Sequence, residues 1–149
     1  MRGTAFLELA PLAARTAAGT SEYDSGTNYI HLGQITHAIA VLDIVSSASD
    51  AGDVLDVYID VSLDEGDTWL NAIHFTQQAG NGAAAKEYAL LALDAAGADP
   101  TAVIAVTSDA ASGKVRPTLL GPQMRARWTI TDSGDGDQSH TFRVFAYVW

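Results

Sequence analysis

The sequence has no cysteine and little positive charge. The missing cysteine excludes disulfides, thiolate zinc sites and cysteine nucleophiles. Only 8 lysines and arginines stand against 18 aspartates and glutamates, which leaves a net charge of -10. A surface of that sign repels nucleic-acid phosphates and anionic membranes, so we expect no direct binding to nucleic acid or to a membrane.

Long hydrophobic runs are also missing. No stretch approaches the roughly 20 apolar residues of a membrane-spanning helix, and the first residues lack the apolar core of a secretory signal. We therefore expect no membrane insertion and no passage through the classical secretory route. A chain of 149 residues fits one domain, which at this size buries roughly 70% of its unfolded surface.

What the sequence does contain is the two-residue alternation of β-strands. It is clearest over residues 39–46, 54–62, 68–76, 124–131 and 141–149. Residues 102–107 also fit a strand, whereas residues 86–93 fit either a strand or a short helix. The pattern predicts an all-β, single-domain antiparallel sandwich or jelly roll of about 8–10 strands over residues 21–149, with residues 1–20 as an N-terminal arm or an edge strand.

The strands are predicted to form two long hairpins. The first joins residues 54–62 to residues 68–76 through a tight turn. The second joins residues 124–131 to residues 141–149 across a connection rich in aspartate and glycine.

The first turn carries the pattern S-x-D-x-G-x-T-W, formed by Ser62, Asp64, Gly66, Thr68 and Trp69. Gly66 adopts positive φ without steric cost, and Asp64 can accept hydrogen bonds from backbone N–H groups two or three residues further on. Trp69 is large enough to cover the base of the hairpin. The pattern resembles the Asp-box of sialidases and other β-rich proteins, which implies a folding device. Sialidase activity is not expected, because the motif occurs once and the arginine cluster of that family has no counterpart.

Motifs of catalysis and cofactor binding are missing. There is no G-x-S-x-G elbow, no glycine-rich phosphate loop and no dinucleotide fingerprint. The histidines are scattered, with no pair at metal-ligand spacing: His31, His37, His74 and His140. We therefore predict no enzymatic activity, no cofactor and no catalytic residue. A Ser-His-Asp triad that meets only in space is the alternative that the sequence leaves open.

Three aspartates, Asp132, Asp135 and Asp137, lie in a glycine-rich segment over residues 132–139. Carboxylates in such a segment can present oxygens to calcium, but their spacing differs from that of an EF-hand loop. A solvated hairpin turn is the favoured interpretation, and a calcium site is the alternative. Residues 50–53 are predicted to form a plain turn of the same kind.

Four residues near the C-terminal end are candidates for a protein interface: Arg125, Arg127, Arg143 and Trp149. Arg125 and Arg127 share one strand face by the two-residue period. The arginines are expected either to contact an acidic partner or symmetry mate, or to pair with neighbouring carboxylates. Trp149 ends a strand that is either internal to its sheet or at an interface.

A broader pattern is the order of several segments along the chain. They are residues 12–20, the turn over residues 62–69, residues 73–77, and the closing residues 125–130 and 140–144. This order of parts resembles small structural proteins encoded in the head–tail regions of tailed phages and prophages. The resemblance implies a non-enzymatic virion protein, foremost a capsid decoration protein that binds the major capsid protein or another virion protein. It also implies a homo-oligomer, with a trimer favoured, and carries over no catalytic residue. In this interpretation, replacing Arg125 and Arg127 by glutamate would leave the monomer folded and weaken particle binding.

Two alternatives stay open. A tail or head–tail connector subunit is a variant of the same idea and differs in copy number. A carbohydrate-binding β-sandwich would need an aromatic platform, for which the candidates are Tyr23, Tyr29, Trp69 and Trp128. Aromatic residues make up only 8% of the chain, and the core needs many of them.

Overall fold

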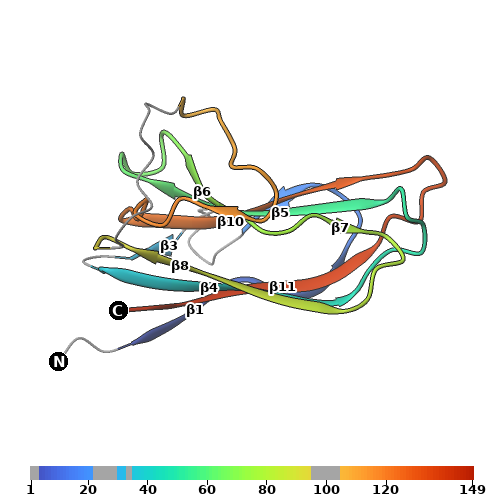
Figure 1. Cartoon of the computed structure of the whole chain (residues 1–149), viewed down its shortest axis with the longest axis horizontal. Coiled ribbons are helices and arrows are strands. Elements are labelled where there is room, and N and C mark those ends of the chain that lie inside the picture. Colours follow the sequence, from blue (N-terminus) through green and yellow to red (C-terminus); the bar gives the residue numbers. More distant parts are fainter. Residues whose placement is uncertain (1–3, 22–29, 33–34, 95–104) are drawn as a thin grey trace.

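The computed structural model describes residues 4–21, 30–32, 35–94 and 105–149. Its strands form two antiparallel sheets that lie one above the other in Figure 1. Within the described ranges no helix has the length and apolar character to cross a membrane. The predicted all-β, single-domain antiparallel sandwich is confirmed.

The first sheet, called sheet A, consists of β1 (Ala5–Arg15), β4 (His37–Ser46), β8 (Ala85–Ala92) and β11 (His140–Val148). Their order is β1-β11-β4-β8, so β1 and β8 are the edges.

The second sheet, called sheet B, contains the remaining strands: β2 (Gly19–Thr20), β3 (Ile30–His31), β5 (Val54–Ser62), β6 (Leu70–His74), β7 (Gln78–Ala79), β9 (Lys114–Val115) and β10 (Gln123–Thr131). The main order is β2-β10-β5-β6-β9, with β3 beside β10 and β7 beside β5.

The start of the chain belongs to both sheets. Residues 5–15 form an edge strand of sheet A, which is one of the two alternatives predicted for residues 1–20. The chain then crosses to sheet B, where β2 pairs with Arg127 and Trp128 of β10. Gly19 is required at this crossing, because a Cβ there would lie 2.6 Å from the Trp128 ring.

The prediction of a second hairpin is wrong. β10 pairs with β5 in sheet B, whereas β11 pairs with β1 and β4 in sheet A. The connection over residues 132–139 therefore crosses between the sheets and closes no hairpin. The physical reason is that each strand has one apolar face, and strands in facing sheets can bury those faces against each other.

Two shorter predictions are also settled by the strand pairing. The ambiguous residues 86–93 are mainly strand β8, which pairs with β4, because ladder formation at the edge of a sheet overrides helix propensity. Residues 102–104 of the strand predicted over 102–107 lie outside the described residues. Residues 105–107 belong to a loop, so that strand is absent from its described part.

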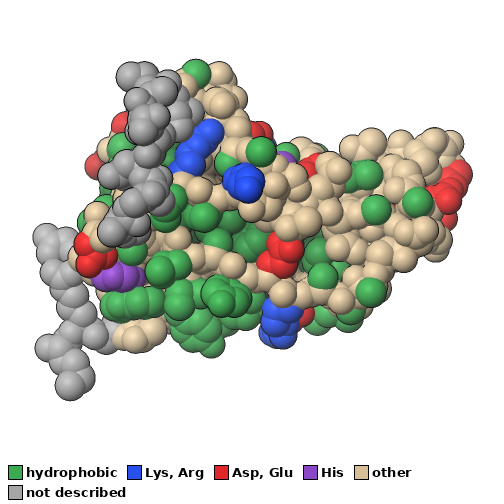
Figure 2. Space-filling view, viewed as in Figure 1, with side chains coloured by type: hydrophobic (Ala, Val, Ile, Leu, Met, Phe, Trp, Pro, Cys, Tyr) green, Lys and Arg blue, Asp and Glu red, His purple; other side chains and the backbone are tan. Residues whose placement is uncertain are grey.

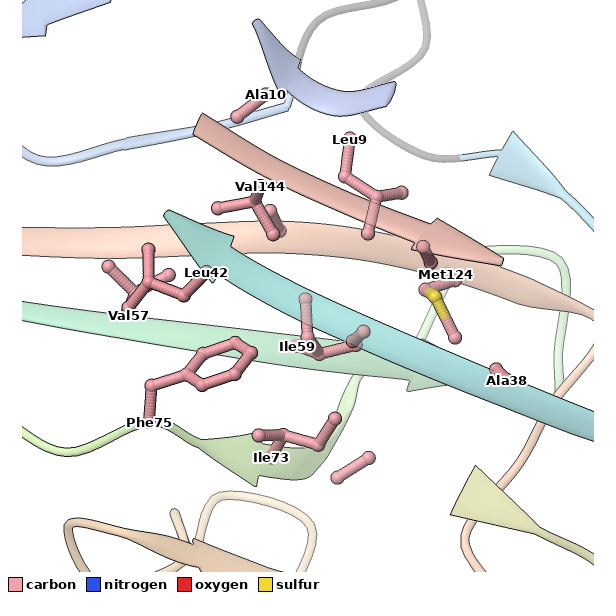
Figure 3. Close-up of a cluster of buried hydrophobic side chains, with 14 of the residues drawn as sticks. Leu9, Ala10, Ala38, Leu42, Val57, Ile59, Ile73, Phe75, Met124 and Val144 are labelled. Atoms are coloured by element: carbon pink, nitrogen blue, oxygen red, sulfur yellow. The ribbon is translucent and has the colours of Figure 1, made fainter. Parts of the chain in front are cut away.

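The hydrophobic core lies between the sheets. Every second residue of β4 and β11 is buried toward sheet B. Buried residues of β5 and β10 face them from sheet B. In Figure 3, Leu42 and Val144 of sheet A face Val57, Ile59 and Met124 of sheet B. Burying a side chain of this size stabilises the fold by about 1.5–3 kcal/mol.

The turn between β5 and β6 is held by its own side chains. Ser62 Oγ donates to Asp64 Oδ1 (2.8 Å) and accepts from the Gly66 N–H (2.9 Å). Asp64 Oδ1 also accepts from the Thr68 N–H (2.8 Å), four residues further on instead of the two or three expected. Positive φ occurs at Gly66 (95°) and also at Glu65 (60°). The hydrogen bonds from Thr68 and Ser62 lower the pKa of the Asp64 carboxyl.

Replacing Ser62 by alanine removes three hydrogen bonds of its side chain, one to Asp64 Oδ1 and two from the Asp64 and Gly66 N–H groups, at a fully buried position. We expect the free energy of unfolding to fall by about 1–3 kcal/mol, because the half-buried Gly66 N–H and the Asp64 N–H lose their acceptor. Urea denaturation followed by tryptophan fluorescence measures the change. Asp67→Ala, at an exposed side chain of the same turn, is the control and should stay within about 0.5 kcal/mol of wild type. Equal stability of the two variants would contradict a structural role for Ser62.

Candidate functional site

The outer face of sheet B is organised around a buried carboxylate. Asp60 of β5 is 2% exposed and accepts hydrogen bonds from Arg125 Nε (3.3 Å) and Arg127 Nε (2.8 Å) of β10. The Asn71 amide donates to Asp60 Oδ1 (3.2 Å), and Arg127 Nη2 reaches Asp109 Oδ1 (2.7 Å). A carboxylate removed from water needs charged or hydrogen-bonding partners, and Arg125, Arg127 and Asn71 supply them to Asp60. These side chains therefore depend on one another and form one buried ion-pair network.

The two arginines stay charged in this network. Burial by itself would lower the pKa of Arg127, but hydrogen bonds and charge attraction from Asp60 and Asp109 outweigh burial and raise the pKa above its ordinary value. Burial lowers the pKa of Arg125, and the attraction of Asp60 offsets part of that change. Guanidinium groups nevertheless remain protonated at neutral pH.

The loop over residues 105–113 covers part of the same face. The Ala110 N–H donates to Asn71 Oδ1 (2.8 Å), and the Ala110 carbonyl lies 2.8 Å from His74 Nδ1. Arg116 donates to the Ser108 carbonyl (2.9 Å) and so fastens the start of the loop. Asn71, His74 and Arg116 thus find hydrogen-bond partners in this loop.

The predicted interface arginines divide between the two sheets. Arg125 and Arg127 share the outer face of sheet B, as their spacing predicts. Arg143 lies on sheet A, where its Nη2 is 2.8 Å from Asp43 Oδ2. All three pair with carboxylates of the chain, which is one of the two roles predicted for them. Contact with a partner stays a prediction.

The described histidines form no common site. His74 Nε2 lies 2.7 Å from Asp56 Oδ1, so both of its ring nitrogens have partners. His140 is buried in the core, and burial lowers its pKa. The side chain of His31 lies outside the described residues.

A hydroxyl, an imidazole and a carboxylate do line up at one end of sheet A. Thr36 Oγ1 is 2.9 Å from His37 Nδ1, and His37 Nε2 is 3.1 Å from Asp94 Oδ1. The Asp94 side chain is 79% exposed, so water competes for it and the pair is weak. A hydrolase triad instead relies on a buried carboxylate to orient its imidazole, and this chain of contacts lacks that feature.

The outer face of sheet A is apolar and open to solvent. Two adjacent rows across the sheet supply it: Phe6, Tyr147, Ile39 and Leu90 in the first, and Phe145, Val41 and Tyr88 in the second, where the exposed Glu8 of β1 lies opposite Phe145. Directly opposite residues of antiparallel strands point to the same side, so the rows form one continuous patch, called the apolar face below. Figure 2 shows hydrophobic side chains gathered along the lower side of the molecule, over sheet A.

The side chains of the apolar face are exposed and mutually supported. Tyr88 is 77% exposed, Phe6 54%, Leu90 44% and Tyr147 43%. The Phe6 ring lies 5.6 Å from the Phe145 ring and 5.4 Å from the Tyr147 ring. Because the rings rest on a sheet and on each other, the surface is formed in advance, which lowers the entropy cost of binding.

Polar residues border the apolar face along the strands. On one side Asp43 pairs with Arg143 (2.8 Å) and with Lys86 (3.3 Å). On the other side the Trp149 ring stacks on His37 at 5.1 Å, and the Trp149 carbonyl accepts from the His37 N–H (3.0 Å). β11 is internal to sheet A, which is one of the two alternatives predicted for the strand that ends at Trp149. An apolar centre with a polar rim is typical of a protein interface.

A groove of about 580 Å³ opens beside β8, between the edges of the two sheets. Its lining includes Ile73, Phe75 and Val115 from the side of sheet B, and Tyr88 and Leu90 from β8. Because Tyr88 and Leu90 also belong to the apolar face, apolar surface continues around the β8 edge.

The two described candidates for a carbohydrate platform, Trp69 and Trp128, lie apart. Trp128 is buried in the core, where its Nε1 donates to the Ala17 carbonyl (3.1 Å). The Trp69 ring lies 4.2 Å beneath the Arg125 guanidinium, on the outer face of sheet B. Tyr23 and Tyr29 lie outside the described residues. The two tryptophans therefore share no open surface.

The acidic segment 132–139 is an exposed crossover between the sheets. Asp132 Oδ1 accepts from the Gly134 N–H (2.8 Å) and so forms a local turn. A hydrogen bond with Asp135 is the main cause that raises the pKa of Asp137 to about 6. The β4–β5 loop lies beside this crossover, where oxygens of Asp50, Asp135 and Asp137 are within 4.8 Å of one another. A hydrogen bond with Asp135 also raises the pKa of Asp50.

No known protein family matches the chain, and no curated protein matches it. One solved structure, of the infectious bursal disease virus Gt strain, is similar with a TM-score of 0.42 and 18% sequence identity. The similarity covers 98% of this chain and 32% of the viral chain, so this chain spans about a third of its length. At this TM-score the similarity does not establish a common fold, and nothing about the viral protein is transferred to this chain.

The structure reverses the expectation for glutamate at positions 125 and 127. The Arg125→Glu, Arg127→Glu variant would place two new carboxylates beside buried Asp60 and remove its cationic partners. We expect a loss of about 3–5 kcal/mol in the free energy of unfolding, or no folded protein, because an uncompensated charge stays buried. Circular dichroism with urea denaturation measures it.

Lys114→Glu, an exposed residue of β9, is the control for charge reversal and should change the stability by less than about 0.5 kcal/mol. A double variant as stable as wild type would show that Asp60 does not depend on the arginines.

Proposed function

We propose that this chain is a non-enzymatic structural protein of a virus particle, which binds a neighbouring virion protein through the apolar face of sheet A. The observation that carries the proposal is the group of exposed aromatic side chains, Phe6, Tyr147 and Tyr88, in the two adjacent rows of the apolar face. Monomeric proteins rarely expose a contiguous apolar patch unless it binds something. The resemblance of the sequence to head–tail region proteins of tailed phages supports a virion as the setting.

A protein surface suits the apolar face better than a membrane or a small ligand. The net charge of -10 opposes an anionic bilayer. The rows of the apolar face extend across all four strands of sheet A, whereas a small-molecule site is normally concave. The ion pairs around Asp43 supply the polar rim that fixes the orientation of a protein partner.

Within this proposal, capsid decoration is the specific role, with the major capsid protein as partner and a homotrimer as the free form. A tail or head–tail connector subunit is the second role, and it would use the same face. The two differ in copy number. Quantitative mass spectrometry of purified particles should find this chain at parity with the major capsid protein, or at a simple fraction of it. A few per cent would assign it to the tail or connector, and absence would refute a virion role.

The apolar face is tested by placing a charge in it. Tyr88→Glu and Tyr147→Glu each change an exposed side chain, so we expect both variants to fold as wild type does. Each should weaken particle binding about 10-fold or more, because an aromatic anchor contributes about 2 kcal/mol to an interface. Co-sedimentation with particles that lack the protein measures the affinity.

Leu63→Glu is the matched control for that experiment. Leu63 is 61% exposed but lies in the β5–β6 turn, away from sheet A, so its replacement should leave binding unchanged. Wild-type binding by both tyrosine variants would refute the apolar face as the contact. Equal weakening by Leu63→Glu would show that added charge alone causes the loss.

A further inference from the structure

Two loops meet at one end of the sandwich. The β4–β5 loop (residues 47–53) and the β10–β11 crossover (residues 132–139) each carry the chain from one sheet to the other. The Ser133 N–H donates to Asp53 Oδ1 (2.7 Å) and joins them. Gly52 allows this approach, because a Cβ there would lie 2.8 Å from Ser133 Cβ. Figure 1 shows both connections at the right-hand end of the molecule.

Five carboxylates converge where these loops meet. Oxygens of Asp50, Asp135 and Asp137 lie within 4.8 Å of one another. Oxygens of Asp53, Asp132 and Asp135 do the same, so Asp135 belongs to both groups. Figure 2 shows acidic side chains at this end of the molecule. None of the ion pairs between described residues involves any of the five, so their mutual repulsion is not relieved by arginine or lysine.

A buried oxygen makes this more than a group of surface acids. Asp53 is 0% exposed, and its Oδ1 is satisfied by Ser133. Its Oδ2 has no hydrogen-bond donor, although the carboxylate points into the group with Asp132 and Asp135. A buried carboxylate oxygen without a donor is costly, and neighbouring carboxylates in their ionised form cannot donate to it. A bound cation would supply the missing partner and offset the repulsion among these carboxylates.

We propose that Asp50, Asp53, Asp132, Asp135 and Asp137 form a calcium site that clamps the two crossovers together. The metal ligands would all be carboxylate oxygens, which suit a hard cation such as calcium and not zinc or copper. Calcium accepts irregular geometry with six to eight oxygens, and loops from two parts of the chain offer such geometry. Magnesium demands near-octahedral coordination and retains its water, so this site favours calcium. The site does not depend on the proposed virion role.

Calcium binding should appear as a gain in thermal stability of the full chain. In CaCl₂ at about 100 times the Kd, we expect the midpoint to rise by about 5–10 °C over its value in EDTA. Titration calorimetry with CaCl₂ should give a Kd of about 10⁻⁵ to 10⁻³ M. MgCl₂ at the same concentration separates specific binding from screening and should give a much smaller shift. No heat and no shift in 10 mM CaCl₂, which is roughly ten times the weakest Kd expected, would overturn the proposal.

Asp135→Asn tests the shared ligand, and Asp67→Asn, an exposed aspartate of the β5–β6 turn, is the matched control. The Asp135 variant should lose most of the calcium shift, whereas the control should keep it. In EDTA the Asp135 variant should be more stable than wild type, because one repelling charge is gone. A calcium shift retained in full by Asp135→Asn, or lost equally by Asp67→Asn, would refute these ligands.

Discussion

The face-to-face packing of two sheets is the constraint on which the rest of this structure depends. Each long strand turns every second side chain toward the opposite sheet, where Leu42 and Val144 meet Ile59 and Met124. Burial of those residues fixes the register of the strands, because a slip by one residue would turn them to solvent. The residues between them are forced outward, so the chemistry of both outer faces follows from the same alternation.

The outer faces of the two sheets differ in polarity. On sheet B the outward residues are polar, and Asp60, once removed from water, requires Arg125 and Arg127 as partners. The loop over residues 105–113 adds further partners and covers the face in part. On sheet A the outward residues of the apolar face need no hydrogen bonds, and the polar residues beside it, Asp43, Arg143 and Lys86, pair with each other. The exposure of the apolar face to water favours burial against a second surface, and for that reason we propose it as the contact with a partner.

The crossovers concentrate negative charge at one end of the sandwich. Turns favour aspartate and glycine for local reasons, and each crossover is a turn of that kind. Sheet packing then brings Asp53 and Asp135 together from distant parts of the chain. Local preference thus explains why the acids are present, whereas their convergence around a buried oxygen is a property of the fold.

The sequence by itself determined the fold class, the 62–69 turn and the strands β4, β5, β6, β10 and β11, because alternation and turn chemistry are local and survive in a linear pattern. Only the tertiary structure decided that β10 and β11 separate into different sheets, that Arg143 parts from Arg125 and Arg127, and that Trp128 is buried. It also decided which strands lie side by side on sheet A and so where the apolar face runs. Strand partners are chosen by burial across the whole chain, and no single segment encodes that choice.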